Sequence, residues 1–396
     1  MKRLAIFFDG TWNSPERGAG LYKPTNVLKL YRALAPVAAD GTQQVGLYLE
    51  GVGAFVGERT HAGKLQMLAD RLLGGLYGGG FEGRVKSACR FLCGNWEPGD
   101  TIHLFGFSRG AAQAASLARF LEWCGGLLAK RDEYFLPELF ATFTASRAAS
   151  GAAEAAIAAI RDRGAAAKRP RRGEAGAIGD PRPAPIAFLG LFDPVLALGS
   201  RLRADLLEGE VGTVEHKLAF HAGRELPGNV HVARTALAVD ERRWDFRPIV
   251  WRPPAELADR LEQRWFPGAH SNVGGGYRQD GLANFPLYWM ASEARAAGLE
   301  LDRSYLAAYR PNPKGDRPDE RRGWIRVSEL LRGKSGRGVR VIEAGEGNLD
   351  DSVLRLLLSD PGYRPANLIG YLRANPNALA GHSGETRRRL EEILFG

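Results

Sequence analysis

Residues 101–115 constrain the fold of this chain more than any other segment. They read as an apolar strand, then Gly106-Phe107-Ser108-Arg109-Gly110, then a run of small helix-forming residues. A strand, Gly-x-Ser-x-Gly and a helix in this order are typical of a nucleophile elbow, a tight turn that lifts the serine hydroxyl above a sheet. Glycines on both sides of the serine leave room for the backbone that meets at such a turn. The segment therefore predicts a nucleophilic Ser108 on a parallel sheet.

Strands and helices alternate along most of the chain. Short apolar runs bounded by Gly, Asp or Pro predict strands, and periodic runs between them predict helices. Together with the elbow, this alternation predicts an α/β-hydrolase fold, with a mostly parallel sheet covered by helices on both faces. Asn26 is expected to cap the first helix. The expected strands are residues 4–8, 44–49, 101–105, 186–192 and 230–239, and the expected helices are residues 26–35, 85–96 and 111–124.

Two regions depart from this pattern. Residues 144–182 are rich in Ala, Arg, Gly and Pro and contain a basic cluster at 168–172. We expect a low-complexity insertion there, with a helix at 152–160 and a remainder lying on the surface. After residue 310 the sequence is again rich in Pro, Gly and Arg. We therefore expect a catalytic domain over residues 1–310 and a C-terminal extension over 311–396 that packs on it.

Composition excludes several classes of protein. Cys89, Cys93 and Cys124 are too few for a disulfide scaffold, and the first two are spaced to share one helix face. No cluster of His, Cys and carboxylate residues has the spacing of metal ligands, so neither a metal nor a cofactor is expected. Asp9 and Asn272 are the two residues at which the sequence still allows a bound cation. The apolar start is too short for a signal peptide, and no stretch is long enough to span a membrane. We expect synthesis in the cytoplasm, with any export by a signal-less route.

A serine nucleophile needs a histidine base and a carboxylate, which follow it in the order acid, then histidine in this fold. His270 is the expected base because it opens a glycine-dense loop after a short apolar run. Asp193 is the expected acid because it ends the strand at residues 186–192. Asp240 is the alternative acid, since it also ends a predicted strand, but the Glu and Arg residues after it are expected to hold it in a structural ion pair.

The loop after the first strand is expected to complete an oxyanion hole. It lies two predicted strands before the elbow, which is where α/β-hydrolases place their second oxyanion donor. We expect the backbone amide of Gly10 or Thr11 to act with that of Arg109, which lies at a helix N-terminus and so carries partial positive charge. Asp9 is expected to hold the shape of this loop.

Seven motifs along the chain are FDGTWN at residues 8–13, TNV at 25–27, GVG at 51–53, GFSRGA at 106–111, FDPV at 192–195, ALAVDERR at 236–243 and WFPGAHSNVGGGY at 265–277. Together they resemble the catalytic domain of the type VI lipase effectors, an α/β-hydrolase family. The resemblance implies a serine phospholipase that acts on membrane glycerophospholipids, with its triad on Ser108, Asp193 and His270. It also implies a secretion-system or immunity partner. The chain departs from the family at Asn272, where members have Asp, and its C-terminal region is shorter than in characterised toxic members.

The basic composition supports a second hypothesis of a different class. A formal charge of +9 and the cluster at residues 168–172 are compatible with a non-enzymatic protein that binds nucleic acid or acidic lipid. No aromatic platform for bases accompanies these residues, so a nucleic-acid partner is not expected. The charge therefore indicates at most contact with an anionic membrane surface.

Overall fold

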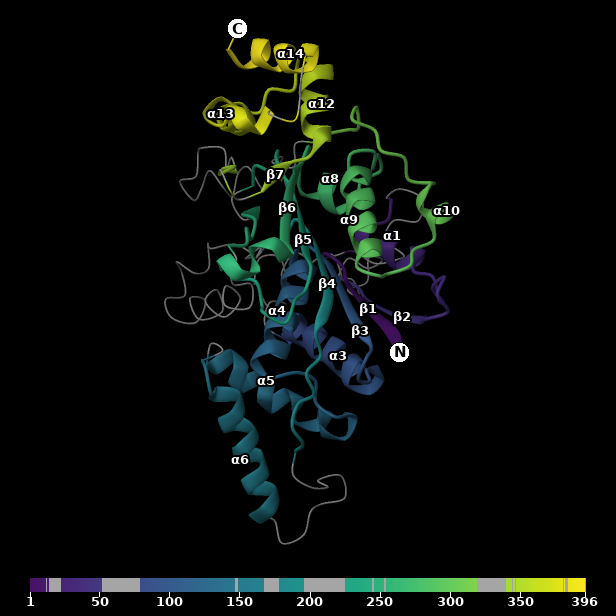
Figure 1. Cartoon of the computed structure of the whole chain (residues 1–396), viewed down its shortest axis with the longest axis vertical. Helices are drawn as coiled ribbons and strands as arrows, with labels where there is room; N and C mark the ends of the chain where they lie inside the picture. The colour runs from purple at the N-terminus through teal and green to yellow at the C-terminus, as the bar shows by residue number, and fades with distance from the viewer. Residues whose placement is uncertain are drawn as a thin grey trace, which may run out of the picture.

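The computed structural model describes residues 1–11, 13, 23–51, 79–146, 149–166, 178–195, 225–243, 246–252, 254–318, 340–343, 345, 347–379, 381 and 384–395. Strands and helices alternate along these segments (Figure 1). The strands are β1 (Lys2–Phe8), β2 (Gln43–Leu49), β3 (Thr101–Phe107), β4 (Ile186–Phe192), β5 (Ala233–Ala238), β6 (Leu261–Phe266) and β7 (Asn348–Leu349). The main helices are α1 (Asn26–Ala33), α3 (Gly79–Asn95), α4 (Arg109–Trp123), α5 (Leu136–Ala145), α6 (Ala152–Ala166), α8 (His270–Gly274), α9 (Asn284–Ala296), α10 (Arg303–Leu306), α12 (Asp351–Ser359), α13 (Ala366–Ala374) and α14 (Gly384–Phe395).

All seven strands pair in one parallel sheet, in the order β2-β1-β3-β4-β5-β6-β7. Strand β1 therefore lies between β2 and β3, and the direction in which the chain adds strands reverses at this point. In open α/β sheets, ligands bind outside the carboxyl ends of the strands at such a reversal. The topology brings the loop that follows β1 beside the turn that follows β3.

Helices cover both faces of the sheet, which confirms the predicted α/β fold (Figure 1). Successive side chains of a strand point to opposite faces. Leu4, Ile6 and Phe8 of β1 belong to a core shared with α3, α4 and α5, whereas Ala5 and Phe7 belong to a second core shared with α1 and α9. The central strands are buried on both sides, as their nearly continuous apolar sequence requires.

The first helix and the last strands differ from the prediction. Helix α1 is capped by Thr25, whose hydroxyl accepts a hydrogen bond from the amide of Leu28, so the predicted cap at Asn26 was wrong. The Asn26 side chain instead donates to the carbonyls of Val273 and Ala283. Strands β6 and β7 were missed. The former has three polar residues in its middle and the latter has two residues in all, so neither has the apolar run by which a strand is recognised.

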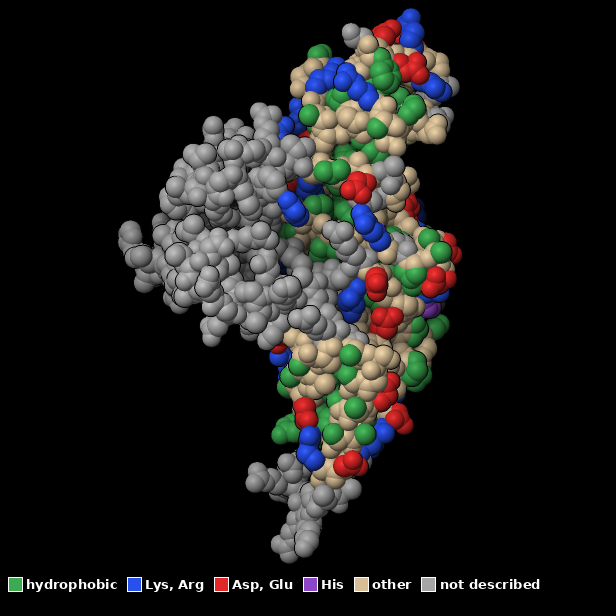
Figure 2. All heavy atoms as spheres, turned by 90° about the vertical axis from the view of Figure 1, so that its left-hand side faces the viewer, with side chains coloured by type: hydrophobic (Ala, Val, Ile, Leu, Met, Phe, Trp, Pro, Cys, Tyr) green, Lys and Arg blue, Asp and Glu red, His purple; other side chains and the backbone are tan. Residues whose placement is uncertain are grey.

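The described part of the predicted insertion is packed helix. Helix α6 includes the predicted helix at residues 152–160, and its Ile157 and Ile160 lie in the same core as residues of α4 and α5. The basic cluster at 168–172 lies outside the described residues. On the face shown in Figure 2, Lys and Arg side chains alternate with Asp and Glu over the described surface. Figure 2 also shows a group of Lys and Arg side chains over the helices at the C-terminal end of the chain.

The C-terminal part of the chain continues the sheet. Strand β7 pairs with β6, with Leu349 opposite Trp265. Helices α12, α13 and α14 bury a third apolar core against Leu237, Val239 and Trp265 (Figure 1). These helices thus pack on β5 and β6, the strands that lead to Asp240 and His270.

The described cysteines are free and buried. Cys89 and Cys93 lie on α3 and contribute to the core that α3 shares with α4 and α5, which confirms that they share one helix face. Among the described residues, no helix is both long enough and apolar enough to cross a membrane.

Candidate active site

Ser108 occupies the turn between β3 and α4. Its backbone has φ 59° and ψ −124°, a conformation that residues other than glycine rarely adopt. Such backbone strain persists only where the surrounding structure imposes it, and it is concentrated at functional sites. The side chain lies at the carboxyl end of a central strand and at the N-terminus of a 15-residue helix.

Two glycines make this turn sterically possible. A Cβ atom on Gly106 would lie 2.4 Å from the Cα of Ala111, and a Cβ atom on Gly110 would lie 2.2 Å from the carbonyl oxygen of Phe8. Any larger residue would therefore push α4 away from β3 or from the end of β1. The glycines hold Ser108 close to the loop that follows β1.

Asp193 leaves the sheet directly beside Ser108. Phe107 and Phe192 are register partners in the β3–β4 pair, and the amide of Ser108 donates to the carbonyl of Phe192 at 3.0 Å. Asp193 itself has φ 41°, so both residues turn sharply out of neighbouring strands. The Asp193 carboxylate is buried, and its Oδ1 accepts a hydrogen bond from the amide of Ala238 at 3.0 Å.

His270 begins α8 and meets Asp193. Its Nδ1 lies 2.5 Å from Oδ2 of Asp193, and both side chains are buried. The ring is held between two aromatic rings, with centroids 4.7 Å from Phe107 and 4.9 Å from Phe246. Burial lowers the pKa of His270, although Asp193 opposes that shift. The contact with Phe107 sets the imidazole against the residue that precedes Ser108.

Glu241 supports His270 from the loop after β5. Its Oε2 accepts a hydrogen bond from the backbone amide of His270 at 3.2 Å. Burial alone would raise the pKa of Glu241, but the hydrogen bonds and the charge of Arg243 lower it below its usual value. The guanidinium carbon of Arg243 lies 3.5 Å from the centroid of the Phe246 ring, which is one of the two aromatic rings in contact with the imidazole.

Asp240 takes a different position. Its Oδ2 accepts from the amide of Gly268 at 2.6 Å, and its Oδ1 accepts from the hydroxyl of Tyr363 at 3.2 Å. Burial raises its pKa above the usual range. The ion pair predicted for Asp240 is instead made by Glu241 with Arg243, so that expectation was wrong. Asp240 holds the loop that leads to His270, while Asp193 is the carboxylate at the imidazole.

Arg340 was not predicted, although it binds the same carboxylate. Its Nη1 lies 2.5 Å from Asp193 Oδ1, and its Nη2 lies 2.8 Å from Asp193 Oδ2. Burial alone would raise the pKa of Asp193, but the charge of Arg340 and the hydrogen bond with His270 bring it well below its usual range. Arg340 stands in an Arg-rich segment in which no local sequence pattern distinguishes it from the other arginines.

Asp9 organises the loop after β1, as expected. It is buried, and its Oδ2 accepts hydrogen bonds from the hydroxyls of Thr25 at 2.6 Å and Tyr48 at 2.5 Å. Its Oδ1 accepts from the amide of Gly10 at 2.6 Å. The Gly10 amide is therefore used within the loop, which corrects its expected role as an oxyanion donor. The amide of Thr11 stays the predicted oxyanion donor of this loop.

Side chains join the two loops expected to form an oxyanion hole. Nε of Arg109, at the start of α4, donates a hydrogen bond to the hydroxyl of Thr11. This bond holds the loop after β1 against the N-terminus of α4. The amide of Arg109 lies in the first turn of α4, at the positive end of the helix dipole.

Asn272 has a structural role. Its Oδ1 accepts from the amide of Ala269 at 3.0 Å, and its Nδ2 donates to the carbonyl of Asp316 at 2.9 Å. An amide can do both, because it carries a donor and an acceptor, whereas a carboxylate only accepts. Among the described residues, no group of three or more His, Cys, Asp and Glu side chains is arranged to hold a metal ion.

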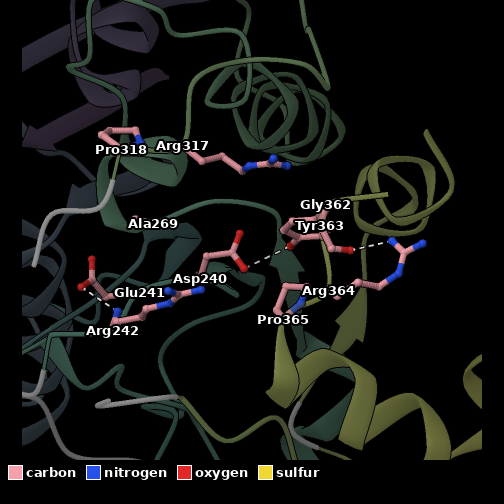
Figure 3. A pocket seen from close by; sticks show the side chains of 10 residues that line it. All are labelled: Asp240, Glu241, Arg242, Ala269, Arg317, Pro318, Gly362, Tyr363, Arg364 and Pro365. Atoms are coloured by element: carbon pink, nitrogen blue, oxygen red, sulfur yellow. Dashed lines mark hydrogen bonds between the residues drawn. The ribbon is translucent and has the colours of Figure 1, made fainter. Parts of the chain in front are cut away.

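A cavity of ≈ 210 Å³ lies behind the loop that carries His270. Asp240, Arg242 and Ala269 line it from the loops after β5 and β6, and Arg317 and Tyr363 line it from the later part of the chain (Figure 3). Ser108, Asp193 and His270 are not among its lining residues. It therefore lies between the C-terminal helices and the loop before His270, apart from the candidate site residues.

Comparison with known proteins identifies a family. The family model described as T6SS, Phospholipase effector Tle1-like, catalytic domain matches residues 2–293. An uncharacterized protein of Saccharomyces cerevisiae, YEL023C, is 35% identical over 136 residues, which are 33% of this chain and 18% of that protein. The chain thus spans less than a fifth of the length of this curated relative.

Two solved structures are also similar. An uncharacterized protein from Pseudomonas aeruginosa has a TM-score of 0.43 and 16% identity, over 99% of this chain and 62% of that one. The Tle1 effector, bound to the VgrG spike from the Type 6 secretion system, has a TM-score of 0.40 and 17% identity, over 87% of this chain and 82% of that one.

Proposed function

The chain belongs to the Tle1-like family of type VI secretion phospholipase effectors, and on that premise we propose that it is a serine hydrolase that cleaves the acyl esters of membrane glycerophospholipids. The observation that carries the proposal is the buried contact between His270 Nδ1 and Asp193 Oδ2, at the end of the strand next to the Ser108 turn. A carboxylate on Nδ1 leaves Nε2 as the atom that accepts a proton. The proposal adds the hydrogen bond from the Ser108 hydroxyl to Nε2 of His270.

The reaction proceeds in two halves. Ser108 Oγ attacks the ester carbonyl carbon while His270 Nε2 takes its proton, and the tetrahedral intermediate collapses as the leaving alcohol receives that proton. The products of this half are an acyl-Ser108 ester and a lysophospholipid. Water, deprotonated by His270, then attacks the acyl ester, and Ser108 regains its proton as the fatty acid leaves.

Backbone amides stabilise the negative oxygen of each tetrahedral intermediate. The Arg109 amide contributes from the N-terminus of α4, where the helix dipole also favours negative charge. The Thr11 amide contributes from the loop after β1, and the hydrogen bond between the Arg109 and Thr11 side chains keeps these donors in position. Asp9 supports the loop but does not contact the reacting atoms.

The test is product analysis by mass spectrometry on mixed phosphatidylethanolamine and phosphatidylglycerol vesicles, together with the rate on a short-chain p-nitrophenyl ester. Ser108→Ala is expected to lower kcat by about 10³-fold or more. Ser87→Ala is the matched control, because Ser87 is exposed on α3 and its hydroxyl donates only to its own helix. Parent-level activity in Ser108→Ala would overturn the proposal. Loss of activity in both variants would indicate misfolded protein. Unfolding curves of both variants, compared with the parent, check that each is folded.

Export by a type VI system is a second part of the proposal. Its support is family membership, together with a solved Tle1 effector that is bound to a VgrG spike. A spike protein is therefore the proposed secretion-system partner, and the test is co-purification of this chain with the spike protein from its own genome. Recovery no greater than with an unrelated spike would contradict it. The alternative hypothesis of non-enzymatic anion binding stays a prediction, because the basic cluster at residues 168–172 lies outside the described residues.

A further inference from the structure

Arg340 connects the C-terminal part of the chain to the proposed active site. The guanidinium is buried and makes four hydrogen bonds with three separate segments. Nη1 donates to Asp193 Oδ1 at 2.5 Å and to the carbonyl of Ala238 at 3.0 Å. Nη2 donates to Asp193 Oδ2 at 2.8 Å and to the carbonyl of Phe246 at 2.7 Å. Paired N–H groups on paired carboxylate oxygens form the arrangement that sets both the position and the plane of a carboxylate.

With Arg340 in place, the carboxylate of Asp193 has two donors on each oxygen. Oδ1 accepts from the Ala238 amide and Arg340, and Oδ2 accepts from His270 and Arg340. A carboxylate has about four acceptor positions, so all are used. Without Arg340, one bond would remain on each oxygen, and the rotation of the group would no longer be restrained by a bidentate partner.

Charge balance around His270 also depends on Arg340. Among the described residues, the charged groups around the pair formed by His270 and Asp193 are Asp193 itself after β4, Glu241 and Arg243 after β5, and Arg340 from the C-terminal part. Two carboxylates and two guanidinium groups leave this cluster neutral when His270 is neutral. Protonation of His270 adds one uncompensated positive charge in a buried site, and this is unfavourable. Removal of Arg340 would leave a net negative cluster that attracts the proton.

The position of Arg340 is set by the C-terminal core. Ile342, two residues later, is buried with α12, α13 and α14, and β7 then joins the sheet beside β6. The family match ends at residue 293, so Arg340 comes from beyond the matched catalytic domain. The guanidinium therefore reaches Asp193 only when the C-terminal part is folded onto the sheet.

We propose that Arg340 is a positioning residue for Asp193, and that the C-terminal part of this chain thereby completes the active site that residues 2–293 contain. The inference rests on the proposed function, in which Asp193 orients His270. Arg340 acts on the reaction through the carboxylate and makes no contact with substrate. Arg340 has two effects. It holds the carboxylate of Asp193 in the orientation in which Oδ2 accepts from Nδ1 of His270, and it keeps His270 neutral at a lower pH than in a protein without this arginine.

Three variants test this role: Arg340→Gln, Arg340→Lys and the control Arg252→Gln. Arg252 lies on the surface and pairs with Glu343 of the same C-terminal segment at 3.2 Å, so its loss perturbs that segment without touching Asp193. On a soluble ester, Arg340→Gln is expected to lower kcat by about 10²-fold with KM changed less than about threefold, because only the orientation of the reacting groups is affected. The acid limb of the kcat/KM profile is expected to move to higher pH. Lysine keeps the positive charge but loses the bidentate geometry. The acid limb of the kcat/KM profile of Arg340→Lys should therefore stay close to that of the parent, while its kcat falls.

A measurement without substrate separates this inference from the proposed function. The ¹⁵N-imidazole signal of His270, assigned with His270→Gln, is titrated by NMR in the parent and the variants. Arg340→Gln is expected to raise the pKa of His270, whatever reaction the enzyme catalyses. Full activity of Ser108→Ala would refute the proposed function and leave this titration as the test of Arg340.

Unchanged kcat, pH profile and His270 titration in folded Arg340→Gln would overturn the inference, even if thermal unfolding occurred at lower temperature, because Arg340 would then only stabilise the fold. If Arg340→Gln does not fold, Arg340→Lys decides the matter. A folded lysine variant with parent kcat would overturn the positioning role, and a reduced kcat at unchanged KM, with Arg252→Gln unaffected, would support it.

Discussion

Nδ1 of His270 lies 2.5 Å from Oδ2 of Asp193, whereas the other aspartate that ends a neighbouring strand, Asp240, binds the amide of Gly268 and the hydroxyl of Tyr363. The two aspartates follow adjacent parallel strands, but their carboxylates have different hydrogen-bond partners. We therefore expect different effects when each is replaced.

Asp193→Asn is expected to lower kcat by up to about 10⁴-fold, because an amide at Nδ1 stabilises the wrong tautomer of His270. Asp240→Asn should lower kcat far less, since the side chain supports the loop and does not face the imidazole. The measurement is steady-state hydrolysis of a soluble ester by both purified variants. A larger loss in Asp240→Asn than in Asp193→Asn would reverse the assignment of the acid.

Gly110→Ala is expected to lower the free energy of unfolding by about 1–3 kcal/mol, because its Cβ would lie 2.2 Å from the carbonyl oxygen of Phe8. Gly94→Ala is the matched control. It is also a helical glycine, but no atom lies within 4 Å of its added Cβ, so intrinsic helix propensity predicts a gain of up to about 1 kcal/mol. Urea unfolding of both variants gives the comparison. Equal effects at the two positions would contradict the steric account of the elbow.

The pH dependence of kcat/KM should follow the ionisation of His270. Burial lowers its pKa below the ordinary value of 6.5, and the base acts only when neutral. Activity is therefore expected to be constant near neutral pH and to fall on acidification through a pKa below 6.5. A soluble ester assayed between about pH 4.5 and 8 tests this, since lipid packing does not enter. An acid limb centred above 6.5 would contradict the prediction.

Lys29 should make the stability depend on pH. It is buried, it pairs with Asp280 at 2.9 Å, and burial lowers its pKa from 10.5 to about 8 despite the opposing charge of Asp280. Between these values the unfolded chain binds the proton that the folded chain has released, so the free energy of unfolding rises with pH. From pH 8 to 10 the contribution is about 2 kcal/mol. Urea unfolding of the parent and of Lys29→Met at both pH values isolates the contribution of Lys29. The tyrosines titrate in both proteins, so their contribution cancels in the comparison. Parallel pH dependences would show that Lys29 does not contribute.

Local sequence patterns were sufficient for the elbow and for most of the sheet. The central strands are buried on both faces, so each is a short apolar run that differs from its surroundings. The elbow is recognisable because its glycines, serine and helix start are contiguous, although the backbone that requires Gly110 is that of Phe8 in β1, far away in the sequence. Strand β6, which is half polar, and the two-residue β7 were missed, since pairing with neighbouring strands, rather than their own composition, makes them strands.

The site residues were recognised to different degrees for a related reason. Ser108 and Asp193 each follow a predicted strand, and the carboxyl ends of parallel strands meet at one edge, so these two positions already indicated one site. His270 was recognised from its glycine-dense loop, because the strand before it, β6, was missed. Whether Asp193 or Asp240 faces the imidazole was left open by that argument, because both residues end strands.

Arg340 is the clearest case in which chain order carried no information. It lies 147 residues after Asp193, among other arginines in a segment with no strand or helix signal. The packing of the C-terminal helices on β5 and β6 buries this one guanidinium beside the carboxylate. The amino-acid order was thus enough to establish the elbow, the parallel sheet and the candidate residues, because these depend on contiguous patterns. The partner of His270 and the arginine on Asp193 depended on the folded chain, because burial and charge pairing are settled only when distant segments pack together.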